Sequence, residues 1–119
     1  MCVVKPDGFI PMFNDSDHGN MRGWMADGAA RFSRPDMRFV ATGGKEGTPP
    51  AGPSHAFPWA GQYIMRSGWT NDDLYLALDA GPYGFGHQHE DKLQLDIWGY
   101  GSDLILDPGR YTYQGGKWR

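Results

Sequence analysis

The chain has 119 residues, the length of one domain, and its 18 glycines and 9 prolines make up about 23% of it, where about 12% is usual. Aromatic residues reach 14%, which provides enough apolar surface for folding and excludes a disordered polymer. The formal net charge is −3 without a basic cluster, and no apolar stretch reaches the length of a bilayer span. Neither nucleic acid nor a membrane is therefore expected as a partner.

The first half of the chain predicts two short helices after a loop-like start. Residues 20–33 place Met21, Trp24, Met25 and Phe32 near one face of a helix. A second helix is expected over residues 35–41, with a proline at its start and a glycine pair after its end. The apolar stripe of this pair is too small for independent stability, so we expect the helices to pack against another part of the protein.

The second half of the chain predicts antiparallel strands. Half of residues 43–58 are glycine or proline, which indicates an irregular connection. Strands are expected over residues 62–69 and 73–80, and alternation of apolar and polar residues predicts a half-buried strand over 93–100. A turn at residues 99–102 makes this last strand one arm of a hairpin that ends at Asp107, before a Pro-Gly pair.

The strongest site signal is a pair of histidines, His87 and His89, in a glycine-rich segment followed by two acids. Residues two apart in extended backbone point to the same side, so both imidazoles can face one site. Neutral imidazole is the commonest metal ligand and also suits proton transfer near neutral pH. A surface turn that happens to contain two histidines is the alternative, and the glycines and acids around the pair make it less favoured here.

Two families with a His-x-His pattern fit poorly. The metallo-β-lactamase type of zinc hydrolase has a further histidine after the aspartate, where this chain has Lys92. Cupins require a glutamate several residues after the histidines, whereas Glu90 is adjacent to them. A third family matches several motifs in the correct order: residues 57–69, then GPYGFGHQHEDKL at 81–93, and LDPGRYTY at 106–113. In these motifs the chain resembles the heparinase II/III-like polysaccharide lyases.

The resemblance covers nearly the whole chain and implies a mainly β fold. Family members combine an α/α toroid with a C-terminal antiparallel β-sandwich, and their active site lies in the cleft between them. Residues 1–43 would then be the end of the toroid domain, a loop and two short helices. Residues 44–58 would be the connection and 59–119 the N-terminal part of the β-sandwich domain. Most of the toroid, with the tyrosine and the Asn/His pair usually credited with catalysis, is not in this chain.

The resemblance also implies roles for individual residues. His87 matches the family's catalytic histidine from the β domain, and His89 and Asp107 match ligands of a metal ion, usually zinc. A third ligand, another histidine, is expected beyond Arg119, so metal binding by this chain alone is expected to be weak or absent. Asp107 is equally well explained as an ordinary turn aspartate.

Three further residues are candidates for contact with an acidic sugar: Arg66, Tyr83 and Arg110. Solvated or salt-bridged arginines and a core tyrosine are the commoner explanations of such residues. His18 and His55 are expected at the surface without a role. The resemblance implies β-elimination of a uronic-acid polysaccharide or oligosaccharide, of alginate or heparin type, by a periplasmic or secreted parent protein.

The isolated chain is expected to be inactive. A non-catalytic domain that binds acidic glycans or supports the toroid is the alternative, and a zinc hydrolase is a third hypothesis. The sequence does not identify the polymer.

Overall fold

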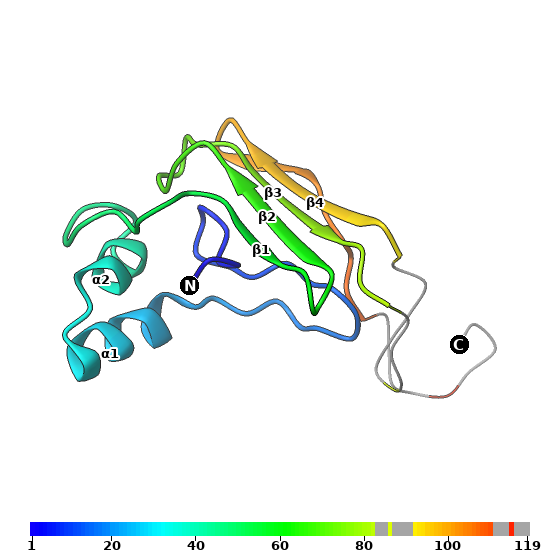
Figure 1. Cartoon of the computed structure of the whole chain (residues 1–119), viewed down its shortest axis with the longest axis horizontal. Coiled ribbons are helices and arrows are strands. Elements are labelled where there is room, and N and C mark those ends of the chain that lie inside the picture. Colours follow the sequence, from blue (N-terminus) through cyan, green and yellow to red (C-terminus); the bar gives the residue numbers. More distant parts are fainter. Residues whose placement is uncertain (83–85, 87–91, 111–114, 116–119) are drawn as a thin grey trace.

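The computed structural model describes residues 1–82, 86, 92–110 and 115, and it contains two helices and one sheet (Figure 1). The five strands form an antiparallel meander in the order β1-β2-β3-β4-β5. The mainly β fold with two preceding short helices is thereby confirmed. The elements are α1 (Arg22–Phe32), α2 (Pro35–Ala41), β1 (His55–Phe57), β2 (Gln62–Arg66), β3 (Tyr75–Asp79), β4 (Gln94–Gly99) and β5 (Ser102–Ile105).

The helix ends follow from local chemistry. α1 ends at Ser33, which adopts a left-handed conformation with φ of 51°. α2 begins with Pro35, whose missing N–H is not needed in the first turn, and it is followed by Gly43 and Gly44, both with positive φ. The predicted apolar stripe of α1 is only partly correct. Met21 and Met25 pack against a core cluster, whereas Trp24 and Phe32 are exposed in this chain.

The strands agree with the sequence prediction, and β1 lies within the segment predicted to be an irregular connection. The β4–β5 hairpin turns at Tyr100 and Gly101, whose φ values of 55° and 76° are those of a two-residue hairpin turn with positive φ at both positions. A bulge between Ile97 and Trp98 shifts the register of β5.

One face of the sheet, the inner face, is covered by the N-terminal segment, residues 1–13. Ile64, Tyr75, Ala77 and Trp98 project from β2, β3 and β4 and form a core cluster with Phe13. The N-terminal segment runs beneath the sheet in Figure 1 and lies between the sheet and the helices. A second cluster, built around Val4, Val40 and Trp69, joins the segment to the helices.

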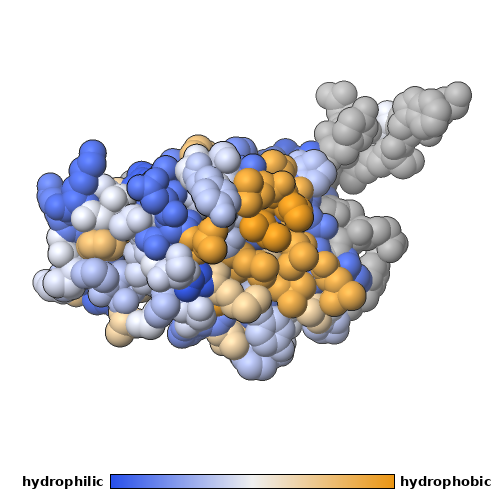
Figure 2. Space-filling model, turned by 90° about the horizontal axis from the view of Figure 1, so that it is seen from above, coloured by the Kyte–Doolittle hydropathy of each residue, from blue (hydrophilic) through white to orange (hydrophobic). Residues whose placement is uncertain are grey.

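The opposite, outer face is apolar along every strand that contributes to it. Cross-strand pairing aligns its residues in rows, for example Met65 with Leu76 and Leu76 with Ile97. Figure 2 shows this apolar patch on the surface of the molecule. The outer face consists of Ala56, Tyr63, Met65, Leu74, Leu76, Leu78, Leu95, Ile97, Leu104 and Ile105.

β4 is half-buried, as its alternation predicts, but its buried side is not the side of the leucine and isoleucine residues. The leucine and isoleucine side chains at 95 and 97 lie on the outer face, whereas Asp96 and Trp98 point into the covered core and are 2% and 6% exposed. Asp96 is accommodated there because the N-terminal segment supplies a charged partner. No helix in the described part of the chain is long and apolar enough to cross a bilayer.

Candidate active site

The three residues of the glycine-rich segment to which the sequence assigns roles, Tyr83, His87 and His89, lie outside the described residues. Their convergence with Asp107 on one pocket therefore stays a prediction. Three predicted site residues are described: Asp107 follows β5, Arg66 ends β2, and Arg110 lies three residues beyond Asp107.

Asp107 is almost completely buried, with 1% of its surface exposed. Its Oδ1 accepts a hydrogen bond of 2.7 Å from the backbone N–H of Gly109, which closes the Asp-Pro-Gly turn. β5 pairs antiparallel with β4, with Ile105 opposite Ile97, so the hairpin runs back along β4 toward Asp107. A buried carboxylate in a fixed orientation is a suitable metal ligand or ion-pair partner.

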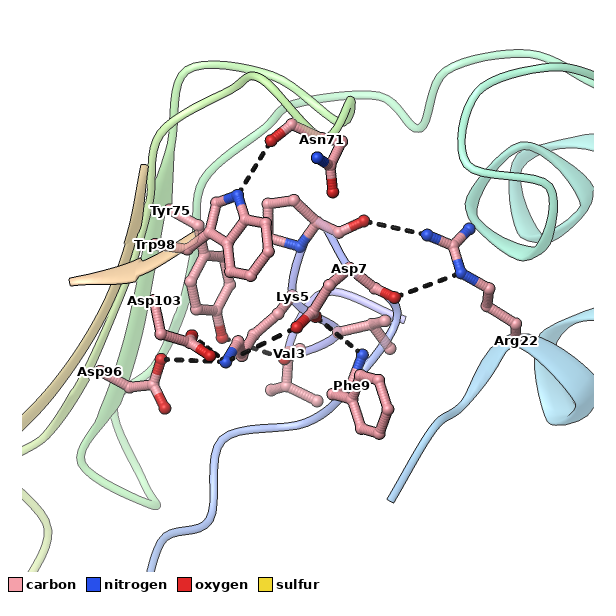
Figure 3. Close-up of polar contacts among 12 residues, drawn as sticks. Val3, Lys5, Asp7, Phe9, Arg22, Asn71, Tyr75, Asp96, Trp98 and Asp103 are labelled. Carbon is pink, nitrogen blue, oxygen red and sulfur yellow. Dashed lines mark hydrogen bonds and ion pairs between the residues drawn. The ribbon is translucent and has the colours of Figure 1, made fainter. Parts of the chain in front are cut away.

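A buried ionic cluster on the inner face was not predicted from the sequence. Lys5 of the N-terminal segment reaches the sheet and pairs with Asp103 of β5 (Figure 3). Its Nζ is 3.8 Å from Asp96 Oδ1 and 3.9 Å from Asp7 Oδ2, and it lies 5.6 Å from the ring centre of Trp98. Lys5 is 6% exposed, so its ammonium group offsets carboxylates within the protein interior.

The electrostatic state of this cluster follows from its composition. The pKa of Asp96 is raised to about 6, mainly by burial; Lys5 opposes this rise, and the charges of Asp103, Asp7 and Asp107 add to it. One lysine thus faces several carboxylates in a poorly hydrated site. The only sequence signal was an aspartate in the middle of a strand, at a position that alternates with the outer-face leucines.

The side chain of Arg66 is buried and bonded to the backbone of the N-terminal segment. Its guanidinium donates to the carbonyl oxygens of Cys2 at 3.2 Å and Val4 at 2.6 Å. It also lies 4.0 Å from the ring centre of Trp69 and 4.8 Å from that of Tyr75. These contacts bind the N-terminal segment to the end of β2 and leave the side chain 8% exposed.

Arg110 is placed differently. Its guanidinium forms an ion pair of 2.6 Å with Asp17 and remains 29% exposed. The two remaining histidines lie at the surface as predicted: His18 rests edge-on against Phe9, and His55 is exposed on the edge strand β1. Of the tryptophans, Trp69 and Trp98 belong to the core and Trp59 is 84% exposed.

The described residues alone do not complete a metal site. Within residues 1–82, 86, 92–110 and 115, no three His, Cys, Asp or Glu side chains are close enough to hold one ion. Asp107 therefore needs ligands from outside this set to coordinate a metal. The described part of the site consists of the buried carboxylate of Asp107 and the partly exposed Arg110, whose ion pair with Asp17 joins it to the N-terminal half of the chain.

The fold and these motifs define a class of protein. Residues 49–119 match the family described as Heparinase II/III-like, C-terminal, and the chain belongs to this family.

Two curated relatives are similar along nearly the whole chain. Heparin-sulfate lyase of Bacteroides stercoris is 30% identical over 117 residues, which is 95% of this chain. Heparin-sulfate lyase of Pedobacter heparinus is 32% identical over 119 residues, or 97% of this chain. The chain spans 18% of the length of each of these relatives.

The fold of this chain is also similar to solved structures of proteins with the same kind of name. The crystal structure of heparan sulfate lyase HepC from Pedobacter heparinus matches with a TM-score of 0.87 and 31% identity, over 98% of this chain and 19% of that one. A structure described as a heparinase III gene product matches with a TM-score of 0.83 and 28% identity, over 97% of this chain and 19% of that one. The similarity includes the helices and the N-terminal segment as well as the sheet.

Proposed function

We propose that this chain is part of a polysaccharide lyase that cleaves a heparin- or heparan-sulfate-type polymer by β-elimination. The observation that carries the proposal is the similarity of nearly the whole chain, in sequence and in fold, to proteins named heparin-sulfate lyase. Alginate, the other polymer suggested by the sequence, has no support among these relatives.

The reaction defines what the site has to supply. The C5 proton of a uronic acid is weakly acidic, and a base can remove it only when the charge of the neighbouring carboxylate is neutralised. An acid then protonates the departing O4. We assign His87 to this chemistry, either in contact with the substrate carboxylate or in proton transfer. The partly exposed Arg110 is a better candidate for sugar contact than Arg66, whose guanidinium is bound to backbone carbonyls. Tyr83 remains a candidate for substrate contact.

We also propose that His89 and Asp107 are two ligands of a zinc ion. The buried carboxylate of Asp107 fits such a role, and structural zinc sites use four ligands, so the remaining ligands have to come from elsewhere. Zinc at this position would fix the histidine-containing segment next to the β4–β5 hairpin. No step of the elimination depends on the metal in this proposal.

The test is a lyase assay on the longer polypeptide that contains this chain, with the 119-residue chain in parallel. We expect heparan sulfate to yield products with the ultraviolet absorbance of a 4,5-unsaturated uronate, only from the longer polypeptide. His87→Ala should reduce turnover by at least about 100-fold, which is the usual contribution of a general acid or base. His55→Ala, at an exposed histidine of the same chain, is the matched control and should be as active as the wild type.

Three results would contradict the proposal. Hydrolysis products without a new double bond would indicate a zinc hydrolase. Binding of heparan sulfate without any turnover of heparin, heparan sulfate or alginate would indicate a non-catalytic glycan-binding domain. Full activity of His87→Ala would remove the assigned role of this histidine while leaving the reaction class in place.

A further inference from the structure

The orientation of the Asp107 carboxylate depends on the backbone of Gly109. The Gly109 N–H donates to Oδ1 at 2.7 Å, and the carboxylate is 1% exposed, so solvent does not compete for this bond. A displacement of Gly109 would therefore lengthen or bend one of the contacts that orient the carboxylate.

Gly109 in turn is packed directly against the N-terminal half of the chain. A Cβ at this position would lie 2.9 Å from the Ser16 carbonyl oxygen and 3.1 Å from Met12 Cβ. Gly109 also has a φ of +67°, which L side chains rarely adopt. The contact with Ser16 involves backbone, which cannot move aside as the end of a long side chain can. Only glycine permits this approach of two segments that are more than 90 residues apart in sequence.

The segment that Gly109 touches, residues 12–17, is fixed to the same sheet. Phe13 inserts into the inner-face core and is 8% exposed. Ser16 N–H donates to the Phe13 carbonyl at 3.3 Å, and Asp17 forms the 2.6 Å ion pair with Arg110. Residues 12–17 therefore contact Gly109 of the Asp-Pro-Gly turn and the adjacent Arg110, and Phe13 fixes their position on the sheet.

We propose that residues 12–17 are a positioning element that sets the orientation of the Asp107 carboxylate through Gly109. This segment lies outside residues 49–119, which match the family of the C-terminal domain. The chemical meaning of the element rests on the proposed function, in which Asp107 is a ligand. The contacts of the element do not depend on that function, because all of them lie within this chain.

The first test compares two glycine substitutions by NMR on the 119-residue chain. Gly109→Ala introduces both the strained φ and the clash with Ser16, whereas Gly52→Ala introduces the same kind of strain at φ +72° with nothing within 4 Å. We expect Gly109→Ala to shift the amide resonances of residues 12–17 and to accelerate amide exchange at position 109 by at least about tenfold. Gly52→Ala should change neither. Equal effects of the two variants on residues 12–17 would overturn the proposal.

A second set of variants decides the question even if Gly109→Ala does not fold. Asp107→Asn retains an oxygen acceptor and should keep the Gly109 amide protected, whereas Asp107→Ala should lose that protection. Asp17→Asn removes the ion pair from the other side of the contact. We expect it to accelerate exchange at Gly109 a few-fold while the amide of Ala77, in the centre of β3, exchanges at the wild-type rate.

Unchanged exchange at Gly109 in Asp17→Asn, with protection lost in Asp107→Ala, would show that the segment does not position the carboxylate. A failed lyase assay would reject the proposed function and leave these measurements as they are. The two proposals can therefore fail separately.

Discussion

The two faces of the sheet differ in both the polarity and the exposure of their side chains. The inner face contains charged groups, Lys5, Arg66 and Asp96, each less than 9% exposed and each held by ion pairs, aromatic rings or backbone carbonyls. The residues of the outer face include no charged side chain, yet Met65, Leu74, Leu104 and Ile105 are about half exposed. Polarity alone therefore does not show which side of this sheet is the interior.

The inner face is therefore held by specific pairs of charged and polar groups, whereas the outer face offers mainly apolar surface that can be buried. A buried charge is tolerated only with its partner in place, so the inner face fixes the position of the N-terminal segment residue by residue. The outer face contains no group that requires a particular neighbour. Apolar sheet faces of this kind are normally buried against another layer of structure.

The largest effect is expected from breaking the inner ionic cluster. Lys5→Met keeps the aliphatic part of the side chain and removes the charge that offsets Asp96 and Asp103. We expect the free energy of unfolding at pH 7 to fall by about 3–5 kcal/mol, the cost of leaving buried charge without its partner. Urea denaturation measures this, and Lys45→Met at an exposed lysine should change stability by less than about 0.5 kcal/mol. Equal effects of the two variants would show that the cluster contributes no stability.

A pair of neighbouring residues on β2 compares the two faces directly. Ile64 on the inner face is 1% exposed, and Met65 on the outer face is 48% exposed. Ile64→Ala should cost about 2–4 kcal/mol because it leaves a cavity in the core, and Met65→Ala should cost less than about 1 kcal/mol. Thermal and urea denaturation of both variants measure the difference. A Met65→Ala cost as large as that of Ile64→Ala would mean that the outer face is also a core.

Much of the fold was predictable because its signals are local. Pro35 and the glycine pair after Ala41 mark the limits of α2, and a turn with two positive φ values is the usual solution for the β4–β5 hairpin. The face of β4 was not predictable, because the partner that makes Asp96 acceptable in the core is Lys5, 91 positions away in sequence. Periodicity identifies two faces of a strand and does not say which of them is covered.

The residues of the candidate site also fall into those that a local pattern predicts and those that depend on distant contacts. Asp107 was found because an aspartate before Pro-Gly at the end of a hairpin is a recognisable pattern, and the structure places it in a buried, hydrogen-bonded turn. The hydrogen bonds of Arg66 to Cys2 and Val4 depend on a contact between distant segments, for which a single sequence has no signal. The roles of His87 and His89 stay predictions from the motif.

The inner cluster should also make stability depend on pH. The pKa of Asp96 is raised from 3.8 to about 6 by burial, so the folded state holds this proton more tightly than the unfolded state. Its contribution to stability is therefore greatest in acid and is lost as the pH rises from about 4 to about 6. Asp96→Asn should remove this loss. We expect the stability difference between variant and wild type to grow over that range, to at most about 3 kcal/mol.

Urea denaturation at a series of pH values tests this dependence. Asp72→Asn, at an exposed aspartate of the β2–β3 connection, is the control and should follow the wild-type profile. A stability that changes between pH 4 and pH 6 by the same amount in the wild type, in Asp96→Asn and in Asp72→Asn would contradict the assignment to Asp96. The penalty of Lys5→Met should also be smaller at pH 5 than at pH 7, because a protonated Asp96 needs no counter-charge.

The smallest effect on stability is expected on the outer face. A substitution there tests whether this apolar surface is exposed in the chain. Ile105→Thr keeps a β-branched residue on the edge strand β5 and removes apolar area from a side chain that is 48% exposed. We expect a stability change within about 0.5 kcal/mol, since an exposed group gains little from burial. Binding of the apolar dye ANS to the 119-residue chain should decrease. Trp59→Ser removes an exposed apolar side chain that lies outside the outer face, and it should leave ANS binding unchanged. Loss of more than about 1 kcal/mol in Ile105→Thr, with unchanged dye binding, would show that this face is already covered in the chain.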